Sequence, residues 1–284
     1  MKKILSLVLA ALMIAGMLAA ATSCGAKKVK IGVQSGTTGE LFLNGDEDAG
    51  YAGFSNVATT AYDNAGLAVA DLVNGKVKYV AIDAAVAKSL AAGNDKIKVI
   101  DYALTKEDFG IGVDKAQTEL LANINAFIAS HKADIAALYE KYGNVNDDNS
   151  ASWSGDTIPA GTYDASKNQL VIATNAAFAP YEFKVGENFA GIDMELAKQI
   201  ADALDMELVI VDMEFEAVVS SIGKNGVDAA FSGLTITPAR QKVINFSTPY
   251  EEGSYQVIIA LKTDTTFDAC KSADDVLKVL SELK

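Results

Sequence analysis

Short apolar runs alternate with segments of helical periodicity along most of the chain, and this alternation limits the possible folds more than any other feature. Segments 65–83 (AGLAVADLVNGKVKYVAID) and 216–233 (EAVVSSIGKNGVDAAFSG) each predict a helix, an Asn-Gly stop and a buried strand. Strands that alternate with helices form parallel sheets covered by helices. Two such units in 284 residues predict an α/β protein with two lobes and a cleft between them.

A polar stretch at residues 143–167 interrupts this pattern. It is rich in Gly, Ser, Asp and Asn, has almost no apolar periodicity, and predicts a linker. Trp153, the only tryptophan, lies inside it. Packing of this ring onto a domain surface is favoured over a role in binding. Residues 44–56 predict a loop.

The composition excludes several classes of protein. Half of the residues are hydrophobic and 21% are charged, as in globular domains, and the net charge of −13 argues against a broad nucleic-acid role. Two cysteines and one histidine (Cys24, Cys270 and His131) exclude a disulfide scaffold, a CxxC redox site and a Cys/His zinc site. We expect no cofactor, no metal and no catalytic residue. Cys270 is predicted to be a buried thiol, and His131 a solvated or helix-capping residue.

The N-terminus carries a targeting signal. Lys2 and Lys3 precede an apolar stretch from Ile4 to Ala21, and small residues lead to Cys24. This order is typical of a signal peptide over residues 1–23. The cysteine resembles that of a bacterial lipobox, so we expect lipid on Cys24 and a soluble chain at the extracytoplasmic face of the cell membrane. The alternative is an uncleaved membrane anchor.

Two charged residues stand out as ligand contacts. Arg240 is the only arginine beside 23 lysines, which indicates that this position needs a guanidinium group. A guanidinium is planar and binds a carboxylate through two hydrogen bonds. It follows the small polar segment 232–238, whose backbone amides suit an anion. Asp83 ends an apolar strand and either caps the next helix or receives a cation. Thr37 and Thr38 supply hydroxyl and N–H groups near a helix start.

Aromatic and amide residues near the predicted strand ends leave two interpretations open. Phe178 and Phe215 each lie between a strand and a helix, where they either wall a ligand or pack in the core. Asn175 either caps a helix or binds.

Several motifs together resemble a known family. The second half contains LVIATNAAFAPYEF (170–183), GIDMELAKQIADAL (191–204) and MEFEAVVSSIGKNGVDAAFSGLTITPARQKVINFSTPY (213–250), and the first half contains KIGVQSGTTGE (30–40), NGKVKYVAIDAAVA (74–87) and FGIGVDK (109–115). They resemble the extracytoplasmic amino-acid-binding proteins of ABC transporters, the family 3 solute-binding proteins. The resemblance implies the type II periplasmic-binding-protein fold of two α/β lobes with a hinge.

The order of the motifs differs from that of the family. A family member starts with the strand that lies here at residue 170 and runs to the equivalent of residue 284. It then continues with the strand that lies here at residue 29. The chain therefore resembles a circular permutant. We expect one continuous lobe at 111–253, a second lobe split over 27–104 and 257–284, and a hinge at about 105–110 and 252–256.

The resemblance also implies residue roles. Arg240 would clamp the α-carboxylate of an amino acid with the N–H groups of Thr235 and Thr38. Asp83 would bind the α-ammonium with the Gly233 carbonyl and the Thr235 hydroxyl. Further contacts would come from Phe178 and Phe215, which sandwich the ligand side chain, and from Ser232 and Thr37.

Asn175 bears on specificity, because many relatives have Asp there and a buried cation needs a paired charge. This favours a polar uncharged ligand such as glutamine, with acidic ligands, cystine and, through Glu182, basic ligands as alternatives. The expected function is to deliver a polar L-amino acid, as a monomer, to an ABC permease. The alternatives are a prephenate- or arogenate-type dehydratase, with Glu182 as its acid, and a tethered sensor.

Overall fold

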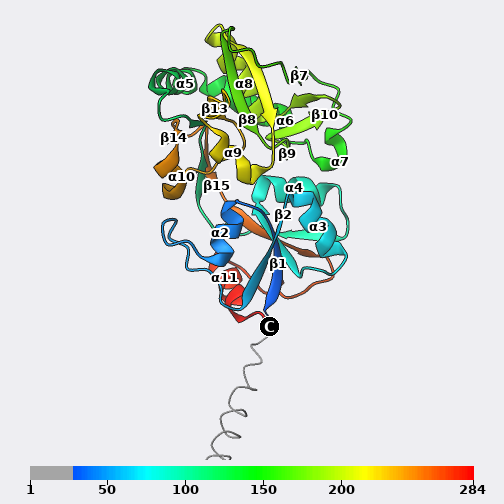
Figure 1. Ribbon diagram of the computed structural model, residues 1–284. Helices are drawn as coiled ribbons and strands as arrows, with labels where there is room; N and C mark the ends of the chain where they lie inside the picture. The colour runs from blue at the N-terminus through cyan, green and yellow to red at the C-terminus, as the bar shows by residue number, and fades with distance from the viewer. Residues whose placement is uncertain (1–27) are drawn as a thin grey trace, which may run out of the picture.

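The computed structural model describes residues 28–284, and these residues form two α/β lobes, one above the other (Figure 1). Each lobe is built around a five-stranded mixed sheet. The chain thus has a two-lobed α/β fold, as the sequence predicts. Among the described residues, no helix combines the length and the apolar character needed to cross a bilayer.

The first sheet defines what we call the β1 lobe. Its strands, in spatial order, are β2 (Val57–Tyr62), β1 (Val29–Gln34), β3 (Tyr79–Asp83), β16 (Gln256–Leu261) and β4 (Ile97–Ile100). Parallel pairing joins the first three, whereas β16 runs antiparallel to both of its neighbours. The helices of this lobe are α2 (Thr38–Asn44), α3 (Ala65–Val73), α4 (Ala84–Ala92) and α11 (Ala273–Glu282).

The second sheet defines the β8 lobe. Its strands, in spatial order, are β12 (Glu207–Asp212), β8 (Gln169–Thr174), β13 (Ala229–Ala230), β6 (Gly112–Val113) and β14 (Asn245–Phe246). The helices of this lobe are α5 (Thr118–Ser130), α6 (Lys132–Tyr142), α8 (Ile192–Ala203), α9 (Phe215–Ser221) and α10 (Pro238–Val243). A smaller sheet adds β9 (Ala177–Phe178), β10 (Glu182–Val185), β11 (Asn188–Ala190) and β7 (Ile158–Pro159).

Two short strands cross between the lobes. Strands β5 (Glu107–Phe109) and β15 (Glu251–Ser254) form an antiparallel pair of their own. Glu251 lies opposite Phe109 in this ladder. These strands bring the carboxylates of Glu107 and Glu251 to the junction of the lobes.

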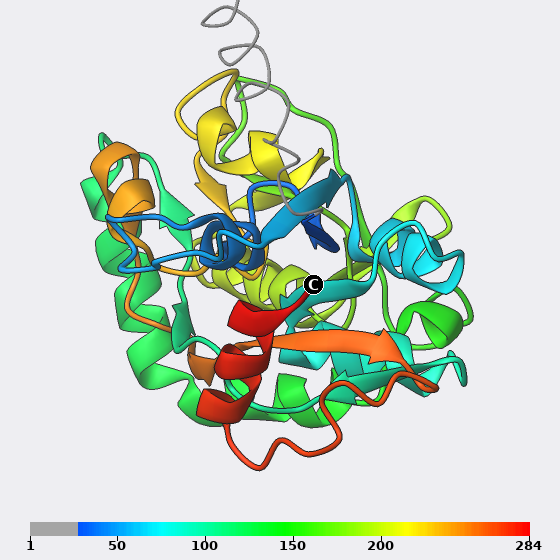
Figure 2. The same ribbon diagram turned by 90° about the horizontal axis from the view of Figure 1, so that it is seen from below.

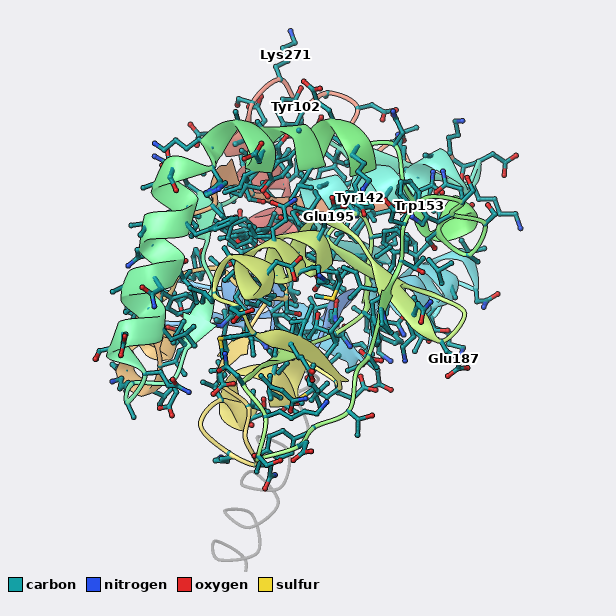
Figure 3. The ribbon with its side chains drawn as sticks, turned by 90° about the horizontal axis from the view of Figure 1, so that it is seen from above. Tyr102, Tyr142, Trp153, Glu187, Glu195 and Lys271 are labelled. Atoms are coloured by element: carbon teal, nitrogen blue, oxygen red, sulfur yellow. The ribbon has the colours of Figure 1, made fainter. Side chains whose placement is uncertain are left out.

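The polar stretch 143–167 is more structured than a plain linker. It contains a short helix, α7 (Asp147–Ser150), and strand β7, which pairs with β11. Trp153 stacks on Tyr142 with ring centroids 5.0 Å apart, and the Tyr142 hydroxyl donates to Glu195 on α8 (Figure 3). The indole therefore packs onto the β8 lobe, as the sequence analysis favours.

Other local expectations need correction. Residues 57–62 form β2, a strand that the sequence analysis does not predict, whereas α2 begins at Thr38, where a helix start is expected. Cys270 is half-buried rather than buried. His131 joins α5 to α6, with its Nδ1 3.0 Å from the Phe127 carbonyl oxygen, as expected of a helix-capping histidine. The signal peptide and Cys24 lie outside the described residues.

Candidate functional site

A small cavity of about 20 Å³ lies between the two lobes. Eight of the ten ligand contacts expected from the sequence line it: Thr37, Thr38, Asp83, Phe178, Phe215, Gly233, Thr235 and Arg240. Sequence reasoning missed five further lining residues: Gln34, Ile82, Glu107, Phe109 and Gln256. Both lobes and the β5 crossing strand contribute, so the cavity depends on how the lobes meet.

Arg240 is held at the first turn of α10. The Thr237 hydroxyl caps this helix by accepting the Arg240 N–H at 3.2 Å, and Pro238 supplies a preset φ. The guanidinium donates to the Thr235 carbonyl at 2.9 Å and, across the cleft, to the Gly36 carbonyl at 3.1 Å. Burial lowers the pKa of Arg240 to about 10, and the charge of Glu107 opposes that shift. The group therefore stays cationic at neutral pH.

Asp83 both caps a helix and faces the cavity. One carboxylate oxygen accepts the Ala85 N–H at 2.9 Å at the start of α4, and the other accepts the Ser254 hydroxyl. Burial raises the pKa of Asp83 to about 7, against the Ser254 hydrogen bond, and the charges of Glu107 and Glu251 raise it further. An ammonium group beside Asp83 would favour its ionised form.

Glu107 is the most informative residue that sequence reasoning missed. Its buried carboxylate accepts the hydroxyls of Thr38 at 2.8 Å, Thr105 at 2.7 Å and Thr235 at 2.7 Å. It thus ties the β1 lobe to the β8 lobe at one end of the cavity. A charged residue inside a predicted hinge segment is the signal that could have identified it.

Direct contacts across the cleft show that the lobes are closed on each other. Gln34 Nε2 donates to Asn175 Oδ1 at 3.0 Å, and the Ser35 hydroxyl donates to Glu216 at 2.9 Å. Lys242 pairs with Asp48 at the edge of the cleft. Each contact joins one lobe to the other.

Asn175 and Ser232, the other two expected contacts, do not line the cavity. Both are buried beneath it, and the Ser232 hydroxyl accepts the Asn175 N–H at 3.1 Å while it donates to Glu182 at 2.9 Å. The Asn175 amide is used by Gln34 and by the Met213 carbonyl. Both side chains are thus engaged in buried hydrogen bonds next to the cavity and do not form its wall.

Two amide oxygens in the cavity wall lack hydrogen-bond partners. Gln34 Oε1 and Gln256 Oε1 are buried and accept no hydrogen bond within the described part of the chain. Buried acceptors are normally satisfied, so each favours an N–H donor on a ligand. The cavity lining carries two carboxylates, Asp83 and Glu107, against one guanidinium, Arg240. The wall therefore favours a ligand that is rich in N–H groups and positively charged.

Comparisons with known proteins place this cleft in a family context. Residues 170–283 match the model of the bacterial extracellular solute-binding proteins, family 3. The arginine-bound form of domain 1 from TmArgBP is 36% identical, with 100% of that domain and 43% of this chain covered, at a TM-score of 0.30. Residues 170–283 of the chain are therefore similar to the family 3 solute-binding proteins.

Curated members of the family match over part of their length. The arginine-binding extracellular protein ArtP of Bacillus subtilis (strain 168) is 34% identical over 95 residues, which are 34% of this chain and 37% of that protein. ABC transporter arginine-binding protein 1 of Escherichia coli (strain K12) is 33% identical over 109 residues, 37% of this chain and 44% of that protein. The chain therefore spans less than half the length of these relatives in the matched stretches.

Proposed function

We propose that this solute-binding protein captures a cationic L-amino acid between its lobes and delivers it to an ABC permease. One observation carries the proposal: Arg240 and Asp83 line the same cavity from opposite lobes. A fixed cation and a fixed anion match the carboxylate and ammonium of an amino acid. A ligand that touches both lobes favours the closed state, because it loses half of its contacts when they part.

In this proposal the ligand replaces contacts that the closed protein makes with itself. The α-carboxylate takes the Arg240 N–H that now reaches Gly36 and adds the N–H groups of Thr38 and Thr235. The α-ammonium binds Asp83, with the Gly233 carbonyl and the Thr235 hydroxyl beside it. Phe178 and Phe215 hold the side chain between them.

Three features favour a cationic side chain over the uncharged one expected from Asn175. The cavity lining carries an excess negative charge, and Gln34 Oε1 is an unused acceptor. Asn175 does not line the cavity, so the argument for a neutral ligand that rested on it does not hold. The named relatives bind arginine. We therefore put arginine first and glutamine second.

Calorimetric titration with L-arginine, L-lysine and L-glutamine tests this ranking. We expect L-arginine to bind most tightly and Arg240→Ala to weaken binding of all three by at least about thirtyfold. Gln34→Leu should weaken the binding of L-arginine more than the binding of a small amino acid such as L-alanine. Equal binding of D- and L-arginine, or full binding in Arg240→Ala, would contradict the proposed site.

We further propose the circular permutation and the lobe boundaries predicted above. The family match begins at residue 170 and ends at residue 283, near the end of the chain. Leu283 and Lys284 line the same surface pocket as Val29, and Asn56 donates to the carbonyls of Leu280 and Leu283. Figure 2 shows α11 and the C-terminus over the β1 sheet. The C-terminal end thus lies beside the first described strand.

Restoring the family order tests the permutation. A chain that runs from 168 to 284, through a short Gly/Ser link, and on from 28 to 143 should fold and bind the same ligand with an affinity within about tenfold. Failure of this chain to fold, while the natural order folds, would count against it.

We also propose that Cys24 is lipidated and anchors the protein at the extracytoplasmic membrane face. Radiolabelled palmitate should enter the wild-type chain and not Cys24→Ser, which should appear in the medium or in the soluble fraction. Amino-acid uptake then distinguishes a transport protein from a sensor. Uptake that is lost in the Cys24→Ser strain, or on deletion of an adjacent permease gene, would indicate transport. We propose no dehydratase activity, because Glu182, its candidate acid, does not line the cavity.

A further inference from the structure

A second, larger cavity lies at the junction of the lobes, on the other side of Tyr181 from the first. Its volume is about 350 Å³, within reach of a small organic ligand. One wall is α4, through Ala85 and Ser89, and the facing wall is Tyr139, Tyr181 and the 143–146 turn of the β8 lobe. Helix α4 lies close to helix α7, which follows that turn (Figure 1).

The polar groups in this cavity are built into its walls. Glu251 accepts the hydroxyls of Tyr139 at 2.9 Å and Tyr181 at 3.0 Å, which fixes both carboxylate oxygens. On the opposite wall, Ser89 is 8% exposed, and its buried hydroxyl has no hydrogen-bond partner among residues 28–284. A buried hydroxyl without a partner is uncommon in folded proteins and favours a ligand that supplies one.

Among the described residues, the cavity lining holds one acidic residue, Glu251, and one basic residue, Lys88. Lys88 is the only basic residue in its described lining, and its ammonium is 3.0 Å from Asp101 and 3.3 Å from the Tyr255 hydroxyl. Glu251 is therefore left without a counter-ion. Burial raises the pKa of Glu251 to about 7, against the tyrosine hydrogen bonds, and the charge of Asp193 raises it further. A cation beside Glu251 would offset the free-energy cost of burying its ionised carboxylate.

We propose that this cavity is a second binding site, for a small organic monocation of the alkylguanidinium or alkylammonium class, with Glu251 as its counter-ion. Because its walls come from both lobes, the cation favours the closed state. Tyr181 separates the two sites, and its ring stacks on Phe178 of the first cavity with centroids 5.6 Å apart. Occupation of the second site should therefore strengthen ligand binding at the first.

The test uses n-propylguanidinium, which has a guanidinium group but no carboxylate for Arg240. Calorimetric titration of the wild-type chain should detect binding below about 10 mM. Arg240→Ala should bind the probe as wild type does. Glu251→Gln and, from the opposite wall, Ser89→Leu should each weaken binding at least about thirtyfold. Glu252→Gln, on the same strand with an exposed side chain, is the matched control and should bind normally.

Several results would overturn the proposal. One is that the wild-type chain does not bind the probe below about 10 mM. Another is that Arg240→Ala no longer binds it. A third is that both Glu251→Gln and Ser89→Leu bind it as tightly as wild type. Thermal unfolding of each variant separates misfolding from loss of the site, and the two substitutions act on different elements. L-Arginine titration of the same wild-type sample reports on the proposed function independently.

Discussion

Gly233 shows how a single residue shapes the first cavity. Its φ of +50° lies in the left-handed region, and its N–H donates to the buried carboxylate of Asp193 at 2.8 Å. A Cβ at this position would lie 2.9 Å from Cε1 of Phe178. Only glycine avoids both the backbone strain and this clash.

Gly233→Ala should therefore lower stability and binding together. We expect a loss of about 1–2 kcal/mol in the free energy of unfolding, from urea titration, because the new Cβ adds strain and displaces Phe178. Amino-acid affinity should fall at least about tenfold. Gly186→Ala is the control, because φ is +62° there and no atom lies within 4 Å of the added Cβ. It should lose stability and keep its affinity; an affinity loss of equal size in both variants would contradict the role of Phe178.

Single residues differ in how far the sequence reveals them. Arg240 is identified by its rarity, since a single arginine beside 23 lysines indicates a position that needs a guanidinium group. Glu107 is not a rare residue type, and its place in the hinge segment does not reveal its partners Thr38 and Thr235, which are 69 and 128 residues away along the chain. Asn175 has the expected position at a strand end, but its side chain bonds to Gln34 across the cleft and to the Met213 carbonyl, and it does not line the cavity. Orientation depends on packing that the sequence pattern does not contain.

Helix α10 positions Arg240, and its cap offers a test at the scale of an element. The buried Thr237 hydroxyl accepts the Arg240 N–H, so Thr237→Ala should cost about 1 kcal/mol of stability and loosen the turn that aims the guanidinium. We expect amino-acid affinity to fall several-fold. In α11, Ser272 caps by accepting the Asp275 N–H at 3.2 Å, far from the cleft.

Ser272→Ala thus provides the matched control for that cap. Urea unfolding should register a comparable loss of stability, while calorimetry should register unchanged affinity. If both substitutions leave binding intact, the α10 cap does not position Arg240.

Elements follow from sequence where their pattern is long or strongly apolar. Helix α3 and strand β3 lie within the predicted segment 65–83, and helix α9 and strand β13 match the predicted segment 216–233 to within one residue. Strand β2 was missed because it lies at the edge of its sheet and only Val57 is buried, so its Ala/Thr-rich run lacks an apolar signature.

At the scale of the whole molecule, we expect closure of the two lobes to be coupled to proton uptake. Asp83 and Glu251 lie at the junction of the lobes, with pKa values raised to about 7, chiefly by burial. Asp83 faces Glu107 and Glu251, and Glu251 faces Asp193. We expect both carboxyl groups to become hydrated and to regain pKa values near their ordinary range when the lobes part. Closing without a ligand therefore takes up protons, because the closed form holds them more tightly.

The sign of the pH dependence follows from these shifts. The proton-linked stabilisation of the closed, ligand-free form is fully present below about pH 4 and is lost as the pH rises through 7. X-ray scattering should give a smaller radius of gyration for the ligand-free protein at pH 5 than at pH 8. At pH 8, L-arginine should restore the compact form, because its ammonium takes over the neutralisation of Asp83. The double variant Asp83→Asn, Glu251→Gln should be equally compact at both pH values without ligand. A wild-type radius that is unchanged or larger at pH 5 would show that these carboxyl groups do not govern closure.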